Sequence, residues 1–337
     1  MGRVISTAIQ FIDGFTKPSK EVINSMRSMG NEAIKAGKQI QSAGKTITSV
    51  GSTLTKAITV PIAGVATAAV KTAADFEAAM SEVGAISGAS AQDLATLTAK
   101  AKEMGATTSF SASESAEAMK YMAMAGWKTA DMTAGIAGIM NLAAAAGEDL
   151  GTTSDIVTDG LTAFGMSAKE SGRFADVMAA ASTNANTNVT MLGESFKYCA
   201  ATAGAMGYNI EDISVALGVM ANAGIKGSTA GTTLKNVIAN MAKPTDAQAA
   251  VMQKLGISLT DSSGNMKSFA EVMNNLRTSF NGLSETEKAS YATTLAGKES
   301  MSGLLTIVNA SAADFDKLTE AINGSSGSAE AMAAKML

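Results

Sequence analysis

Apolar side chains recur every seven residues near the start of the chain. With Ala33 at heptad position a, Ile40, Ile47 and Leu54 also occupy position a. Position d is filled by small or aliphatic residues, and a glycine stands beside the seam in each heptad. Such a repeat predicts a helix that packs along one stripe. The predicted helix-packing seam consists of Gly30, Ala33, Gly37, Ile40, Gly44, Ile47, Gly51 and Leu54.

The four glycines make this helix unstable by itself. Each glycine costs a helix about 1 kcal/mol relative to alanine, so close backbone approach to another helix has to offset the loss. That helix could belong to the body of the same chain, to further copies in a homo-oligomeric bundle, or to a membrane-inserted glycine zipper. Lys35, Lys38, Lys45 and Lys56 argue against insertion into a membrane.

Helical signals follow one another over residues 73–244. Ser90 with Asp93, and Ser111 with Glu114, have the spacing of helix N-caps, with Ser113 as the alternative cap of the second helix. The first of these helices is expected to end at Gly105. The apolar runs 57–70 and 132–147 are too short to cross a bilayer, so we expect them to be buried helices.

The helical core carries signs of an internal duplication. When the sequence is shifted against itself so that "SAQD" at 90–93 meets "SAKE" at 167–170, further positions agree. At the same offset, Glu117, Lys120 and Tyr121 meet Glu194, Lys197 and Tyr198. The expected copies are residues 75–165 and 166–244; coincidence among helices rich in alanine and serine is the alternative.

A different pattern follows Pro244. In "GISLTDSSGNMKSF", residues 256–269, apolar and polar residues alternate around a Ser-Ser-Gly-Asn turn, which predicts a short β-hairpin. Ser284 and Glu287 then form a capping box. The expected organisation is a basic heptad segment (1–72), a helical core (73–244), a hairpin plus helices (245–322), and a flexible break before a further helix (323–337). The predicted fold class is an all-α multi-helix bundle.

Composition removes most catalytic chemistry. The chain has no histidine and one cysteine, Cys199, which excludes His-based triads, histidine zinc ligands and intrachain disulfides. Cys199 is expected to be a small buried apolar residue. The acidic group Glu148, Asp149, Asp155 and Asp159 is expected to lie on solvated helix faces. We therefore predict no catalytic residue, no metal site, no cofactor and no small-molecule substrate.

Charge is divided unevenly along the chain. The net charge is −4, with 26 Lys and Arg against 30 Asp and Glu. Residues 1–72 hold nine basic and three acidic side chains, whereas the remainder holds 17 and 27. The basic segment is either a solvated helix face or a contact for something acidic, such as a tube lumen, lipid or nucleic acid.

Several stretches resemble the core of phage tail tape-measure proteins. They include "TAADFEAAMSEVGAISGAS", "GTTLKNVIANMAKPT", "LGISLTDSSGNMKSFAEVMNNLR" and "GKESMSGLLTIVNAS", and the similarity covers roughly residues 45–337. Members of that family are usually much longer, so this chain is either the N-terminal portion of a longer product or a short relative.

The resemblance implies a structural role in the virion tail, after assembly in the host cytoplasm. Such proteins lie in the lumen of the tail tube, where tube subunits polymerise around them, and their length sets the tail length. The implied partners are the tail tube protein, tail assembly chaperones and further copies of the chain, with transient membrane or DNA contact during genome delivery. A membrane-active helical pore or DNA-passage protein is the alternative.

Overall fold

The computed structural model describes residues 73–336, which form an almost wholly helical unit. Residues 73–87 are helical. The solenoid-like part consists of α3 (Ala91–Thr107), α4 (Ala112–Met124), α5 (Thr129–Ala146), α6 (Leu150–Phe164), the 3₁₀ turn η1 (Ala168–Glu170), α7 (Ser171–Asn184), α8 (Val189–Ala205), α9 (Ile210–Asn222) and α10 (Gly227–Ala242). The remaining helices are α11 (Asp246–Leu255), α12 (Phe269–Phe280), α13 (Glu285–Ala296), α14 (Met301–Asn309), α15 (Ala312–Asn323) and α16 (Ser328–Met336).

Local capping explains where many of these helices begin. The Ser90 hydroxyl accepts the backbone N–H of Asp93, and Ser111 and Ser284 each form a complete capping box with the glutamate three residues later. These N-caps confirm the sequence prediction. They satisfy N–H groups that have no partner inside the helix.

The predicted end of α3 is wrong by two residues. The helix passes through Gly105 and ends at Thr107. A Cβ at position 105 would collide with the backbone of Ala112. Gly105 therefore permits a close approach between α3 and the start of α4, and it does not act as a helix stop.

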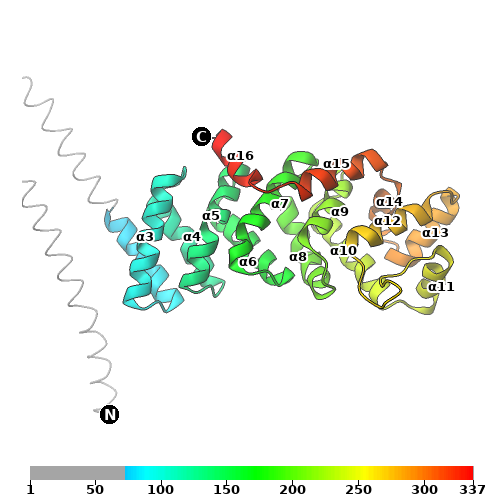
Figure 1. Cartoon of the computed structure of the whole chain (residues 1–337), viewed down its shortest axis with the longest axis horizontal. Coiled ribbons are helices and arrows are strands. Elements are labelled where there is room, and N and C mark those ends of the chain that lie inside the picture. The colour runs from blue at the N-terminus through cyan, green and yellow to red at the C-terminus, as the bar shows by residue number, and fades with distance from the viewer. Residues whose placement is uncertain (1–72, 337) are drawn as a thin grey trace, which may run out of the picture. The chain divides into compact units, whose positions relative to one another are not determined.

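The helices from α3 to α10 pack in two layers. Each helix contacts the helix two places further along the chain, so α3, α5, α7 and α9 lie side by side, as do α4, α6, α8 and α10. Figure 1 shows the pairs following one another in chain order. The second helices of the pairs begin at Ala112, Leu150, Val189 and Gly227, so the pairs recur at nearly equal steps along the chain.

The same positions are buried in each of these second helices. The fifth residue is small and buried in all four helices: Ala116, Ser154, Gly193 and Gly231. The eighth is a larger buried residue: Met119, Val157, Phe196 and Leu234. A small residue lets the next helix approach, and the larger side chain three positions on fills the space between the layers.

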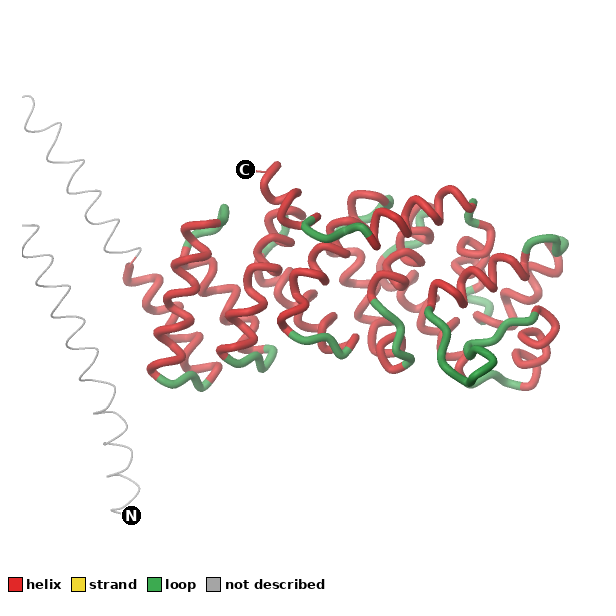
Figure 2. Tube along the Cα trace, in the orientation of Figure 1, coloured by secondary structure: helices red, strands yellow, loops and turns green. Residues whose placement is uncertain are grey.

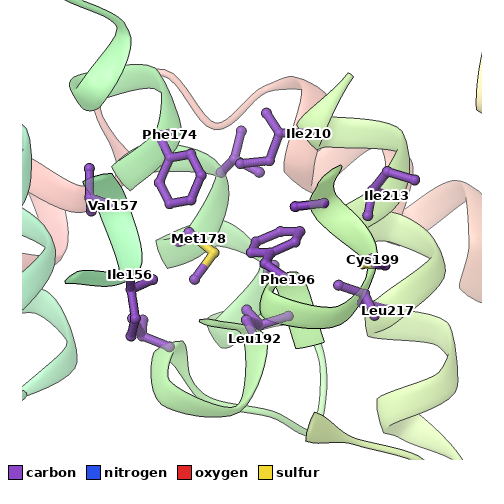
Figure 3. Packing of buried hydrophobic residues seen from close by; sticks show 14 of the residues in the cluster. Ile156, Val157, Phe174, Met178, Leu192, Phe196, Cys199, Ile210, Ile213 and Leu217 are labelled. Atoms are coloured by element: carbon purple, nitrogen blue, oxygen red, sulfur yellow. The ribbon is translucent and has the colours of Figure 1, made fainter. Parts of the chain in front are cut away.

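The centre of the core lies between α6, α7, α8 and α9. Figure 3 shows Phe174, Met178 and Phe196 turned toward one another, with Leu192 and Leu217 nearby. The Phe174 and Phe196 ring centroids are 6.0 Å apart, and all five of these side chains are at least 97% buried. Figure 3 also labels Cys199 among these residues.

Residues 132–147 confirm their predicted role as a buried helix. They fall within α5 and its left-handed C-cap, Gly147. Ile136, Ile139 and Leu142 are fully buried. Neighbouring helices cover α5 on one side, and α16 covers it on another. A helix that is apolar on most of its circumference requires such cover on more than one face. The other predicted buried run, 57–70, lies outside the described residues.

The β-hairpin prediction is not confirmed. Within residues 73–336 the backbone forms no strand, and the segment after α11 contains a single antiparallel bridge between Thr260 and Met266. Figure 2 shows this segment as loop. The Asp261 carboxylate accepts the backbone N–H groups of Ser263 and Asn265, at 2.8 and 2.9 Å. The turn therefore forms as predicted, but no β-ladder extends beyond the single bridge.

The C-terminal helices run back over one layer of the stack. In Figure 1, α15 and α16 pass over α9, α7 and α5, and contacts between these helices agree with that view. The Asp176 carboxylate on α7 accepts the backbone N–H groups of Gly327 and Ala329, at 2.8 and 2.9 Å. Asp176 is therefore an N-cap for α16 supplied from a distant part of the chain.

Replacing Asp176 by alanine should loosen α16 selectively. The change leaves N–H groups at the start of α16 without a partner, and loss of an N-cap costs about 1 kcal/mol. Hydrogen exchange should therefore accelerate several-fold at residues 327–336 and stay unchanged in α8. Asp316→Ala, which removes an exposed carboxylate from α15, is the control and should change neither region. Equal protection of α16 in both variants would contradict the assigned cap.

Candidate functional site

The predicted helix-packing seam, Gly30 to Leu54, lies outside the described residues. The structure therefore leaves that prediction as it stands. Among residues 73–336, a recess lies between α6 and α8. It is a cavity of about 410 Å³ with an open side, and Ala125, at the end of α4, closes one edge.

Glycines allow α6 and α8 to lie close enough to form this recess. A Cβ on Gly193 of α8 would lie 2.6 Å from the Ile156 side chain on α6. A Cβ on Gly204 of α8 would collide with the carbonyl oxygen of Ala163 on α6. The cavity walls are largely apolar, from Ile156, Ala163, Phe196, Ala200 and Ala201.

Two charged side chains of opposite sign line the cavity, Asp159 on α6 and Lys197 on α8. Asp155 lies one turn before Asp159. Partial burial and the neighbouring Asp159 charge raise the pKa of the Asp155 carboxyl, while Lys197 opposes the rise. These groups make the cavity amphipathic. Asp155, Asp159 and Lys197 are all exposed on the surface of α6 and α8.

The other two carboxylates of the predicted acidic group have structural roles. Asp149 is the N-cap of α6, and its side chain accepts the backbone N–H of Thr152 at 2.8 Å. Glu148 accepts the hydroxyl of Thr190, near the start of α8, at 2.5 Å. The four carboxylates therefore do not converge on one point. Within residues 73–336 no group of three or more acidic or cysteine side chains has the arrangement of a metal site.

Cys199 is fully buried, which confirms its expected apolar role. Burial raises the pKa of the Cys199 thiol to about 12. Very little thiolate, the reactive form, is therefore present near neutral pH. The residue contributes packing between α8 and its neighbours.

The burial of Cys199 predicts a simple chemical result. In the folded chain, a thiol reagent such as Ellman's reagent at pH 8 should label less than one tenth of the protein within an hour. In denaturant the pKa returns to about 8.5, and labelling should reach one thiol per chain within seconds. Rapid labelling without denaturant would contradict the position of Cys199 in the core.

Sequence reasoning missed two carboxylates that join distant helices. Asp176 caps α16, and Asp212 on α9 accepts the backbone N–H of Ala270 at the start of α12, at 2.9 Å. Burial raises the pKa of Asp212, and the bond from Ala270 works against that rise. No local pattern could have identified these roles, because the partners lie 58 or more residues away.

An ion pair also connects neighbouring helices within one layer. The Arg173 guanidinium on α7 donates two hydrogen bonds to Glu211 on α9, at 2.7 and 2.8 Å. This bidentate arrangement holds the relative orientation of the two helices. Among the helices of residues 73–336, none combines the length and apolarity that a membrane span needs.

Comparison with known proteins gives a consistent result. The family model for phage-related minor tail proteins matches residues 98–297. The chain is 39% identical over 280 residues to a protein of Pneumococcus phage Dp-1 described as a tape measure protein, covering 83% of this chain and 24% of that one. It is 27% identical over 283 residues to a probable tape measure protein of Escherichia phage P2, covering 80% and 35%. The chain thus spans about a quarter of the length of the first relative and about a third of the length of the second. No solved structure matches it.

Proposed function

The chain belongs to the family of phage-related minor tail proteins, and on that premise we propose that it acts as part of a tape measure in a phage tail. The similarity to the Dp-1 tape measure protein carries this proposal, because it extends over 83% of the chain. In this role the protein occupies the tube lumen, templates polymerisation of the tube and limits its length. The partners are the tube protein and the tail assembly chaperones, the site of assembly is the host cytoplasm, and release from the tube accompanies genome delivery.

The packing of residues 73–336 suggests how length is divided along such a protein. Packed helices lie about 8–10 Å apart, so each successive helix pair adds roughly 10 Å to the stack. If the stretch 112–149, which holds one step of the stack, were a single continuous helix, it would extend roughly 57 Å. We infer that the extended segments of a tape measure account for most of the tail length, and that this helical unit is a compact part of it.

The N-terminal heptads are the segment of this chain suited to an extended form. We infer that residues 30–54 pair with further copies along the seam of Gly30, Ala33, Gly37, Ile40, Gly44, Ile47, Gly51 and Leu54. Lys38 and Lys45 then face outward, toward an acidic tube wall or DNA. Reversing the charge of Lys35, Lys38 and Lys45 together should impair tail assembly. Normal assembly by that variant would remove the proposed role of the basic face.

The predicted duplication agrees with the stack of helix pairs if each copy contains two pairs. The offset that aligns Glu117 with Glu194 also aligns Ala112, the first residue of α4, with Val189, the first residue of α8. One second helix, α6, begins between these two at Leu150. The offset therefore spans two steps of the stack. We propose that the repeated element is a single helix pair, and that each of the longer copies contains two such elements.

The experiment that tests the function is a peptide map of purified tails combined with a tail-length measurement. Peptides of this chain should be present in tail particles. Removing residues 37–50, two heptads, should keep the register and shorten the tail by about 21 Å if the segment is a continuous helix. Absence of the chain from particles would overturn the tape-measure role. Tails of unchanged length would overturn the extended form of the heptad segment alone.

The membrane-active alternative is not adopted, because no observation within residues 73–336 favours it.

A further inference from the structure

One surface of the helical stack has features that suit a second copy of the chain. We call it the outer face and define it by the exposed and half-buried side chains on the solvent side of α6, α8 and α10. The opposite layer is covered by α15 and α16. In the described part of the chain, α6 and α8 contact only neighbouring members of the stack. Their outward sides are therefore open to solvent in this unit.

The middle of the outer face combines exposed apolar side chains with Glu194 and Lys197 of α8, whose charged groups lie 4.0 Å apart. Met191 and Tyr198 on α8 are 42% and 41% exposed, and they stand seven residues apart on one side of the helix. They are two of only five large hydrophobic side chains that are exposed within residues 73–336. Small residues follow on the same side, with Ala201 and Ala205 exposed. A partner helix could therefore approach α8 closely.

The two flanks of the outer face carry opposite charge. The only charged residues within α6 are Asp155 and Asp159, both acidic and exposed. The only charged residue within α10 is the half-buried Lys235; the half-buried Lys226 and the exposed Lys243 stand at the two ends of that helix. Neither Asp155, Asp159 nor Lys235 forms an ion pair in the described residues. Lys197 of the same chain attracts Asp155 without forming an ion pair with it, so the two exposed carboxylates can still meet a lysine of a partner.

We propose that two copies of the chain associate through the outer face about a two-fold axis that passes near α8. In this arrangement α6 of one copy lies opposite α10 of the other, and the same contact is repeated on the other side of the axis. Asp155 and Asp159 meet Lys235 of the partner copy twice. Met191 and Tyr198 of both copies form the apolar part of the centre, and Glu194 and Lys197 of each copy lie beside them.

The composition of the face agrees with that of protein interfaces. Such interfaces have an apolar, often aromatic, centre and a polar rim. A two-fold interface must be self-complementary, because the same patch of both copies meets with its two sides exchanged. The outer face meets this requirement because its α6 side is acidic and its α10 side is basic. The cavity of about 410 Å³ beside α8 provides a recess for an apolar side chain of the partner.

This surface is separate from the N-terminal seam, so its test must report on α8 directly. In the full-length chain, Tyr198→Cys places a thiol near the proposed axis. A short bis-maleimide should link most of that variant into covalent dimers. The unmodified chain is an internal control, because Cys199 is buried and unreactive. Asp316→Cys, exposed on α15, should give at least fivefold less dimer.

Charge reversal then tests the predicted partners. In the Tyr198→Cys background, Asp159→Lys should lower the dimer yield at least fivefold, because two lysines now face each other twice. Adding Lys235→Glu to the same chain should restore most of the yield. Equal cross-linking of the Tyr198→Cys and Asp316→Cys variants would overturn the proposal. Loss of yield without restoration by Lys235→Glu would overturn the two-fold arrangement.

The outcome is independent of the tape-measure role. The N-terminal seam can bring copies together, but it does not dictate which residue of the body lies at the axis. Failure of the cross-link would leave the peptide map of tails unaffected. Absence of the chain from tails would equally leave the outer face intact.

Discussion

Replacing Phe174 by alanine should lower the free energy of unfolding by about 3–5 kcal/mol. The ring is fully buried and packs against Phe196 and the backbone of Gly160. Because Gly160 has no side chain, it cannot extend into the space that the ring vacates. Chemical denaturation followed by circular dichroism at 222 nm measures the change. The midpoint should fall while the slope with denaturant stays constant, since the exposed surface on unfolding is nearly the same.

Met266→Ala is the control for this experiment. Met266 is 44% exposed and lies in the loop after α11. Its removal should change the free energy of unfolding by no more than about 0.5 kcal/mol. If the two variants were equally stable, Phe174 would not be at the centre of the core and the packing of α7 against α8 would be wrong.

The same substitution at two helical glycines should have opposite effects on stability. Gly231 lies where α10 meets α8, and a Cβ there would collide with the carbonyl oxygen of Ser195. Gly231→Ala should therefore cost about 1–3 kcal/mol, because backbone has to move to relieve the clash. Gly172, near the start of α7, has open space around it. Gly172→Ala should stabilise the protein by about 0.4–1 kcal/mol, because alanine restricts the unfolded chain.

Thermal unfolding of the two variants side by side provides the measurement. The melting temperature should fall for Gly231→Ala and rise for Gly172→Ala relative to the unmodified chain. Both variants change one hydrogen to a methyl group inside a helix, so helix propensity favours both equally. The two sites differ in whether the backbone of a neighbouring helix lies against the glycine. A rise in both variants would show that α8 and α10 are not in close contact at Gly231.

The composition and the helix caps determined the class of the fold. An N-cap is a local device, because a serine hydroxyl or an aspartate carboxylate reaches a backbone N–H only three residues away. Ser90, Ser111 and Ser284 could therefore be identified from the order of residues alone. The buried role of Cys199 also followed from the sequence, since a lone cysteine without histidine has no partner to activate it. The resemblance to tape-measure proteins likewise needed no structure.

The sequence misjudged features whose cause lies elsewhere in the chain. Gly105 has the identity of a helix stop, but it serves as the contact point for the start of α4. The alternation around residues 257–266 has the pattern of a hairpin. There, Asp261 takes the N–H groups of the turn, and Met266 remains 44% exposed with no sheet to join. A two-stranded hairpin that packs against no further strand or helix is only marginally stable in water.

The two-layer arrangement was decided only by tertiary packing. Which helix lies beside which depends on the volume of side chains at matched positions, such as the small Gly193 and Gly231 followed by Phe196 and Leu234. The carboxylate of Asp176 illustrates the same limit, since it caps a helix that begins more than 150 residues later. Local sequence determines what each helix can be, because capping and periodicity act within a few residues. Its neighbours are chosen by burial and hydrogen bonding across the whole unit, and those contacts exist only once the chain has folded.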